Sequence, residues 1–152
     1  FIMATINTKN VHRTNHLLGH PYGEDFRYDE MVVTSPGEMG KKAAEMLVNA
    51  NPLAGDKGPK PGEGPSKAER DAGFYDVLFI GEWPDGRTAR FGVKGDRDPG
   101  YGSTSRMIAE TAILLSERAH DSDGGVWTPG ALFGEQLAKR LEERAGLAFA
   151  SE

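Results

Sequence analysis

Hydrophobic and polar positions recur with two different periods along the chain, and the changes in period predict its elements. Residues 2–18 space a few apolar side chains among Asn, His and Arg residues, which is compatible with a helix that has one very polar face. Residues 25–34 alternate instead, with Phe26 and Tyr28 on one face and Met31 and Val33 on the other. This second pattern predicts a strand.

Two helix starts follow the same local rule. Residues 35–38 (SPGE) place Ser at the N-cap, Pro at the first helical position and Glu at the third, which is a capping box. The helix that follows should stop at Asn51-Pro52. Residues 66–69 (SKAE) repeat the capping box and predict a short helix to about Ala72. Between the two helices, residues 53–65 form a Gly-, Pro- and Lys-rich loop that we expect to be mobile.

The strongest strand signal lies in the second half of the chain. Residues 74–83 and 87–94 are rich in apolar and β-branched side chains and flank the turn Pro84-Asp85-Gly86, so they predict an antiparallel hairpin. Residues 103–117 are helical in pattern and apolar on most sides, and we expect this helix to be central and buried.

One more helix and one more strand complete the predicted order. Thr128 can cap a last helix with Pro129 at its first position, and Gly146 ends it. Residues 147–150 follow as an edge strand. The order predicts an α+β fold, with helices packed on a mixed or antiparallel sheet that contains a central hairpin. At 152 residues we expect one domain, residues 1–152, with a sizeable core.

Composition and charge narrow the function classes. The net charge of −5 with scattered Lys and Arg argues against nucleic acid as a partner. No apolar run approaches the ~20 residues that span a bilayer, so we expect no membrane span. The absence of Cys excludes disulfides, Cys-ligated metal and a thiol nucleophile, and is compatible with a cytoplasmic location.

The residues that precede the helix at 103–117 are the best candidates for chemistry. Residues 100–105 (GYGSTS) carry two of the three glycines of a dinucleotide-binding loop, but the strand before them belongs to a hairpin. Three interpretations stay open: a simple glycine turn, a dinucleotide cradle, or a helix start whose amides hold a substrate carboxylate or phosphate with help from Ser103, Thr104 and Arg106. The carboxylates of Asp96 and Asp98 are more typical of turn residues that cap backbone amides.

The first predicted helix offers two further candidates. Arg13 stands among polar residues and can clamp a planar carboxylate, or simply form an ion pair. His12 and His16 have the i, i+4 spacing of helical zinc ligands, but no further metal motif accompanies them, and we expect polar surface residues rather than a metal site. Trp83 and Trp127 are expected to cover a core or an interface.

Five segments together resemble a known domain. They are residues 7–15 (NTKNVHRTN), 22–28, 95–104 (GDRDPGYGST), 107–110 (MIAE) and 124–130 (GGVWTPG). In order and spacing they resemble the C-terminal domain of bacterial saccharopine dehydrogenase-like oxidoreductases, a group that includes trans-acting enoyl reductases. The resemblance covers nearly the whole chain.

The resemblance implies an enzyme with two domains, in which an N-terminal Rossmann domain binds NAD or NADP. The second domain closes the substrate cleft and commonly forms a homodimer. We therefore expect this chain to be a C-terminal fragment without its cofactor-binding half, inactive alone, with no cofactor of its own. Arg13, Tyr101, Gly102 and Arg106 are our candidates for contact with a small anionic substrate. A structural self-association domain without a ligand site, or a small anion- or metal-binding module, is the alternative.

Overall fold

The computed structural model describes residues 1–49, 62–118 and 121–151, which divide into two compact units. The first unit spans Phe1–Glu63 and the second Gly64–Glu152, and each is described by itself. The expectation of one domain stays a prediction. The predicted loop at 53–65 lies mostly outside the described residues.

The described residues of the first unit form two helices, α1 (Ala4–Leu17) and α2 (Gly37–Asn49). Helix α1 confirms the helix predicted over residues 2–18. Its one buried residue is Asn15, whose amide group donates to the Gly23 carbonyl at 2.9 Å and accepts from the Tyr22 amide at 3.0 Å. Asn15 thereby fixes the turn that leads the chain back along the helix.

The strand predicted over residues 25–34 is wrong, because the structure has no strand there. A strand needs a neighbouring strand for its backbone groups, whereas this segment is tied to α1 through side chains. Glu30 accepts hydrogen bonds from Asn7 at 3.0 Å and from Tyr28 at 2.9 Å, and the Phe26 ring contacts His12 with centroids 5.6 Å apart. Of the alternating apolar residues, Phe26 contacts the helix through His12, whereas Met31 and Val33 are exposed.

Helix α2 begins at Gly37, one residue after the predicted first position, and ends before Asn51-Pro52 as predicted. Its start needs a glycine, because a Cβ at Gly40 would lie 1.4 Å from the Ser35 carbonyl oxygen.

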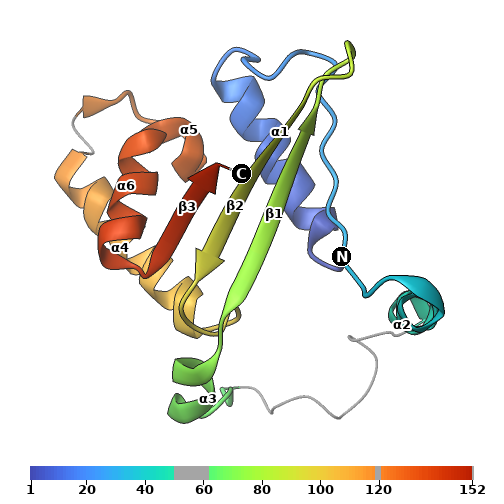
Figure 1. Cartoon of the computed structure of the whole chain (residues 1–152). Coiled ribbons are helices and arrows are strands. Elements are labelled where there is room, and N and C mark those ends of the chain that lie inside the picture. Colours follow the sequence, from blue (N-terminus) through green and yellow to red (C-terminus); the bar gives the residue numbers. More distant parts are fainter. Residues whose placement is uncertain (50–61, 119–120, 152) are drawn as a thin grey trace. The chain divides into compact units, whose positions relative to one another are not determined.

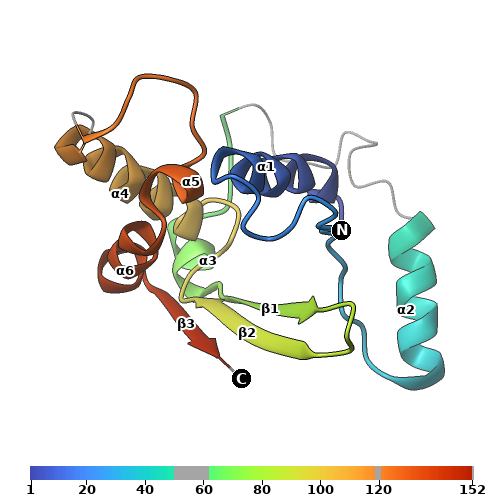
Figure 2. The same ribbon diagram turned by 90° about the horizontal axis from the view of Figure 1, so that it is seen from above.

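The second unit is an antiparallel three-stranded sheet with helices on it, which confirms the α+β fold class (Figures 1 and 2). Strand β2 lies between β1 and β3. The elements, in chain order, are α3 (Lys67–Ala72), β1 (Tyr75–Glu82), β2 (Thr88–Gly95), α4 (Gly102–Arg118), α5 (Pro129–Phe133), α6 (Glu135–Arg144) and β3 (Leu147–Ser151). Figure 1 shows α4, α5 and α6 gathered at the β3 side of the sheet.

The core of the second unit is small and joins α6 to β3. Leu141, Ala145 and Leu147 are buried, and four partly buried apolar side chains pack around them: Val93, Met107, Leu137 and Phe149. Because these side chains come from α4, α6 and two strands, this cluster fixes the helices on the sheet.

Two sequence expectations about the helices are corrected. Only Gly102, Ser103 and Leu114 of α4 are buried, and Ile108 is 68% exposed, so α4 is not a buried central helix. The last predicted helix is two helices, since Gly134 adopts φ 50° and ψ −125° and separates α5 from α6. Such a backbone conformation interrupts the helical hydrogen bonds.

Candidate functional site

The start of α4 is capped by the chain's own carboxylate. Asp98 accepts hydrogen bonds from the backbone amides of Gly100 at 3.0 Å, Tyr101 at 3.0 Å and Gly102 at 2.6 Å. These bonds, that of Gly102 above all, hold the pKa of the Asp98 carboxyl below its ordinary value, and the charge of Arg70 acts in the same direction. The prediction that a turn carboxylate caps these amides is confirmed.

This cap changes the chemistry available at the helix start. The three amides that an incoming carboxylate or phosphate would need already bind an internal anion. The strand before the loop is part of an antiparallel hairpin, whereas a dinucleotide-binding loop belongs to a parallel βαβ unit. The backbone amides of this helix start are therefore already occupied by Asp98.

Three of the four candidate substrate residues lie together at this helix start. Tyr101 is exposed, and its ring passes so close to Gly64 that a Cβ there would lie 3.5 Å from the ring. Gly102 is buried, and a Cβ on it would be 3.1 Å from Cβ of Arg97, so this glycine serves close packing. The Arg106 guanidinium lies 3.5 Å from the Asp96 carboxylate. Arg13 is an exposed residue of α1, in the first unit.

A hydrogen bond between Tyr75 and Ser103, which sequence reasoning missed, supports the same helix start. The Tyr75 hydroxyl is 2.8 Å from Oγ of Ser103, which is fully buried. Tyr75 pairs with Gly95 across the hairpin, and the missing side chain of Gly95 leaves room for the ring. The sequence signal for this contact was a Tyr that faces a Gly across two paired strands. Using that signal requires the register of the two strands, and the turn alone leaves the register uncertain.

An ion-pair network joins α4 to α6. Arg140 donates to Glu110 at 2.7 Å and to Glu117 at 2.8 Å. These hydrogen bonds, that of Glu110 first, raise the pKa of Arg140 above its ordinary value. Because both acceptors lie on α4 and the donor on α6, the network fixes the spacing of the two helices.

An apolar groove of about 250 Å³ lies between α4 and α5. Its lining residues are Ile108, Thr111, Ala112, Leu115, Trp127, Pro129, Leu132 and Phe133. The predicted cap of α5 is confirmed, since Thr128 Oγ1 accepts from the Ala131 amide at 3.4 Å. Trp127, expected to cover a core or an interface, is 39% exposed and forms part of the wall.

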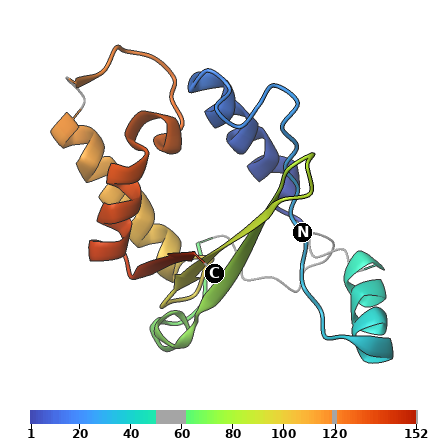
Figure 3. The same ribbon diagram turned by 45° about the horizontal axis from the view of Figure 1, so that its top comes forward.

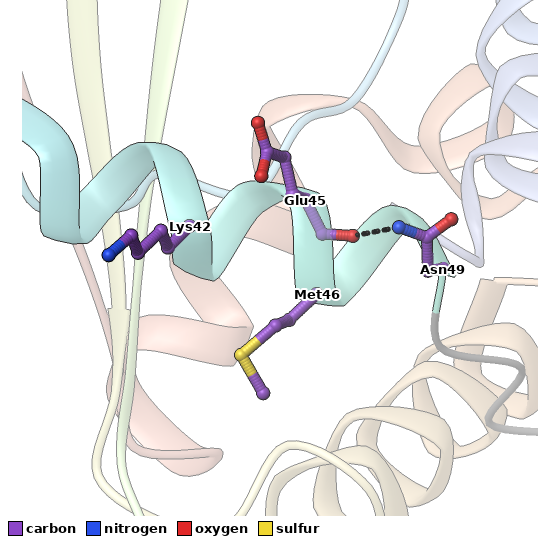
Figure 4. A pocket seen from close by; sticks show the side chains of 4 residues that line it. All are labelled: Lys42, Glu45, Met46 and Asn49. Atoms are coloured by element: carbon purple, nitrogen blue, oxygen red, sulfur yellow. Dashed lines mark hydrogen bonds between the residues drawn. The ribbon is translucent and has the colours of Figure 1, made fainter.

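A second hollow lies on α2 and is formed by Lys42, Glu45, Met46 and Asn49 (Figure 4). The Asn49 amide donates to the carbonyl oxygen of Glu45 at 2.8 Å. Since one helix supplies all four side chains, the hollow lacks opposing walls and has no set of groups that converge on a ligand.

The candidate metal residues on α1 form ring contacts instead. Nδ1 of His16 lies 3.4 Å from Nε2 of His20, and His12 packs against Phe26. Among the described residues, no group of three or more His, Asp or Glu side chains is arranged to hold a metal ion. Within the same residues no helix is long and apolar enough to cross a membrane.

Comparison with known proteins identifies relatives of this chain. A provisionally named trans-acting enoyl reductase of Mycobacterium tuberculosis is 36% identical over 159 aligned residues, which cover 93% of this chain and 38% of that protein. Trans-acting enoyl reductases of Mycobacterium bovis and Mycobacterium ulcerans are 30% and 29% identical, over 93% and 94% of this chain. No protein-family model and no solved structure matches. The chain is therefore homologous to a part of the proteins named trans-acting enoyl reductase and spans 38% of their length.

Proposed function

We propose that this chain is the substrate-binding and self-association part of an NAD(P)H-dependent enoyl reductase whose cofactor binds to another part of the longer protein. The reaction implied by the relatives' name adds a hydride from NAD(P)H and a proton across a carbon–carbon double bond conjugated to a carbonyl group. The observation that carries the proposal is the alignment with proteins of that name over 93% of the chain. The wider kinship with saccharopine dehydrogenase-like enzymes is part of the same proposal.

The antiparallel sheet supports a cofactor site in another part of the longer protein. Dinucleotides bind at the carboxyl ends of parallel strands, next to a helix that follows a glycine loop. In the described residues the glycine loop follows an antiparallel hairpin, and Asp98 occupies its amides. A nucleotide site elsewhere in the longer protein is therefore the simplest arrangement, with this chain contacting substrate.

For substrate contact we propose the exposed side chains at the start of α4, Tyr101 and Arg106, with Arg13 as a separate candidate. The Arg106 guanidinium forms a long, exposed ion pair with the Asp96 carboxylate at 3.5 Å. A substrate carboxylate or phosphate can take the place of Asp96 at a small cost in free energy. Gly102 contributes by packing, which lets the helix start approach Arg97 closely.

For self-association we propose the edge strand β1. Its sequence, YDVLFIGE, is apolar on both faces and contains neither Lys nor Pro, the residues that commonly protect an edge strand from pairing. Leu78 and Ile80 are 44% and 56% exposed, on the face opposite to Val77 and Phe79. Strands with two apolar faces are typical of sheet interiors, so pairing of β1 with β1 of a second copy would place this strand inside a larger sheet.

Steady-state kinetics of the longer protein tests the substrate role. Arg106→Ala should raise KM for an anionic enoyl thioester about tenfold with a smaller change in kcat, because a binding contact is lost. Arg118→Ala is the matched control, since Arg118 also lies on α4 and pairs with an Asp, Asp121, at 3.2 Å. Equal effects of the two variants would contradict a substrate contact at Arg106, and a longer protein that binds neither NADH nor NADPH would overturn the reductase proposal.

Sedimentation over a concentration range tests the self-association role. A dimer that Leu78→Lys converts to monomer supports the edge-strand proposal, because a charged side chain would be placed beside the partner strand. A monomer at every concentration contradicts it. A dimer combined with an Arg106→Ala variant of unchanged KM favours the alternative, a structural self-association domain without a ligand site.

A further inference from the structure

The groove between α4 and α5 has walls made almost wholly of hydrocarbon, with aromatic side chains on the α5 side. Ile108 and Leu115 on its α4 side are 68% and 46% exposed, so the apolar surface is open to water. Open apolar surface of this kind gains free energy when another apolar group covers it. We propose that this groove binds the saturated hydrocarbon chain of the acyl substrate, an inference that rests on the proposed function.

The two polar side-chain groups in the walls are already used. Oγ1 of Thr111 donates to the Met107 carbonyl at 2.7 Å, and Nε1 of Trp127 donates to the Asp123 carbonyl at 3.3 Å. A ligand with hydroxyl or charged groups would lose its bonds to water and find no side-chain donor in return. A methylene chain loses nothing on entering, so the walls select for hydrocarbon.

The size of the groove fits part of a ligand rather than a whole drug-sized molecule. Its volume of about 250 Å³ lies below the ~300–1,000 Å³ that is usual for pockets of drug-sized ligands. The far end of a linear chain can fill such a groove. The thioester, and the neighbouring double bond that the reaction reduces, then stay outside the groove. Each methylene that enters should raise affinity about fourfold until the groove is full.

The position of the walls in the fold explains how the groove keeps its shape. Arg140 ties α6 to α4 through Glu110 and Glu117, and α5 is joined to α6 through Gly134. Figure 3 shows these helices, drawn in orange and red, grouped together. The cap at Thr128 fixes the start of α5 directly after Trp127. The groove is therefore held by contacts that do not involve its own lining, which leaves the lining residues open to substitution.

The test is equilibrium binding of a homologous series of saturated acyl N-acetylcysteamine thioesters, from four to twelve carbons, to the 152-residue chain. Fluorescence of Trp127 reports on occupancy in a Trp83→Phe background. Affinity should rise with each added pair of carbons and then level off. Ala112→Phe, which places a ring in the groove, should weaken binding of the ten-carbon thioester at least tenfold and abolish the chain-length dependence.

Ala109→Phe is the matched control, because Ala109 is an exposed residue of α4 outside the lining. It should bind the whole series as the parent chain does. If Ala112→Phe does not fold by circular dichroism, Ala112→Leu gives the smaller version of the same change. Affinity that is independent of chain length, or equal losses in the two Phe variants, would overturn the proposal.

Two further outcomes separate this inference from its rivals. If Ala112→Phe changes the sedimentation coefficient but not thioester binding, the groove is an interface between copies and the acyl proposal is wrong. Reduction of a four-carbon enoyl thioester by the longer protein tests the reductase function without the groove. Activity on that substrate without chain-length dependence overturns the groove alone, whereas chain-length-dependent binding without reduction overturns the reductase function and leaves the hydrocarbon site.

Discussion

Gly95→Ala should be one of the most damaging small substitutions in the sheet. Gly95 is the last residue of β2 and pairs with Tyr75 of β1. Its backbone lies outside the left-handed region, so alanine itself is not strained there. The added Cβ, however, would lie only 2.1 Å from Cε1 of Tyr75, and the ring would have to move away.

The expected cost follows from what Tyr75 does. Moving the ring breaks its 2.8 Å hydrogen bond to Ser103 and leaves the fully buried Ser103 hydroxyl without that partner, which costs about 1–3 kcal/mol. The half-buried ring also loses part of its apolar contact, about 1 kcal/mol. Alanine returns about 0.5–1 kcal/mol because it restricts the unfolded chain more than glycine does. The net expectation is a loss of about 1–3.5 kcal/mol in the free energy of unfolding.

Gly81→Ala is the matched control for this change. Gly81 lies in β1 on the same hairpin, and a Cβ there would meet the Trp83 ring at 3.6 Å and the Ala89 carbonyl oxygen at 4.0 Å, both ordinary contacts. The same chemical change should therefore stabilise the protein, by about 0.5–1 kcal/mol. Urea unfolding followed by circular dichroism measures both, provided that the m-value is unchanged. Two variants within about 0.5 kcal/mol of each other would refute the reasoning, as would a full Gly95→Ala penalty that persists in a Tyr75→Phe background.

Three further predictions rest on single groups. Because the pKa of Asp98 is lowered in the folded chain, its contribution to stability is present above the unfolded value of about 3.9 and lost as the pH falls; urea midpoints of Asp98→Asn should depend less on pH between 5 and 2 than those of the parent chain, and parallel curves would contradict the cap. Burial, followed by Glu30, raises the pKa of Tyr28 from its ordinary value of 10.0 to about 12, so its contribution to stability is complete below pH 10 and is lost as the pH rises from 10 to 12; absorbance at 295 nm should show a late titration step that Tyr28→Phe removes. Ser66→Ala should destabilise α3 by about 1 kcal/mol, because Ser66 accepts from the Glu69 amide while Glu69 accepts from the Ser66 amide; hydrogen exchange of the α3 amides that is unchanged in the variant would contradict this.

Local rules predicted the elements whose causes are local. The capping box at Ser66 forms as predicted, and the helix after it ends at Ala72. The turn at Pro84-Asp85-Gly86 joins two paired strands, with the Trp83 amide donating to the Arg87 carbonyl at 2.9 Å. Gly146 adopts φ 74° directly after Ala145, the C-cap residue of α6, as a glycine at this position should. Each of these depends on a few adjacent residues, so sequence spacing was sufficient.

Contacts between distant segments were beyond the same rules. The alternation over residues 25–34 resembles a strand, but only the contact of Glu30 with Asn7 and Tyr28 shows that the segment follows a helix. In the candidate site, the cap by Asp98 was predicted because it is local. The pairing of Tyr75 with Ser103 was missed because it joins residues 28 positions apart.

Two surfaces leave apolar residues exposed where the sequence predicts a central hairpin and a buried helix. One is the edge strand β1 with Leu78 and Ile80, and the other is the groove with Ile108 and Leu115. Burial of apolar surface is the main favourable contribution to folding and association, so a sequence that keeps such residues at regular spacing favours covering them. The proposed strand pairing would cover the first surface and the acyl chain the second. On these proposals, the apolar positions of residues 103–117 are covered when substrate binds. The prediction of a buried helix was then wrong about which group covers them.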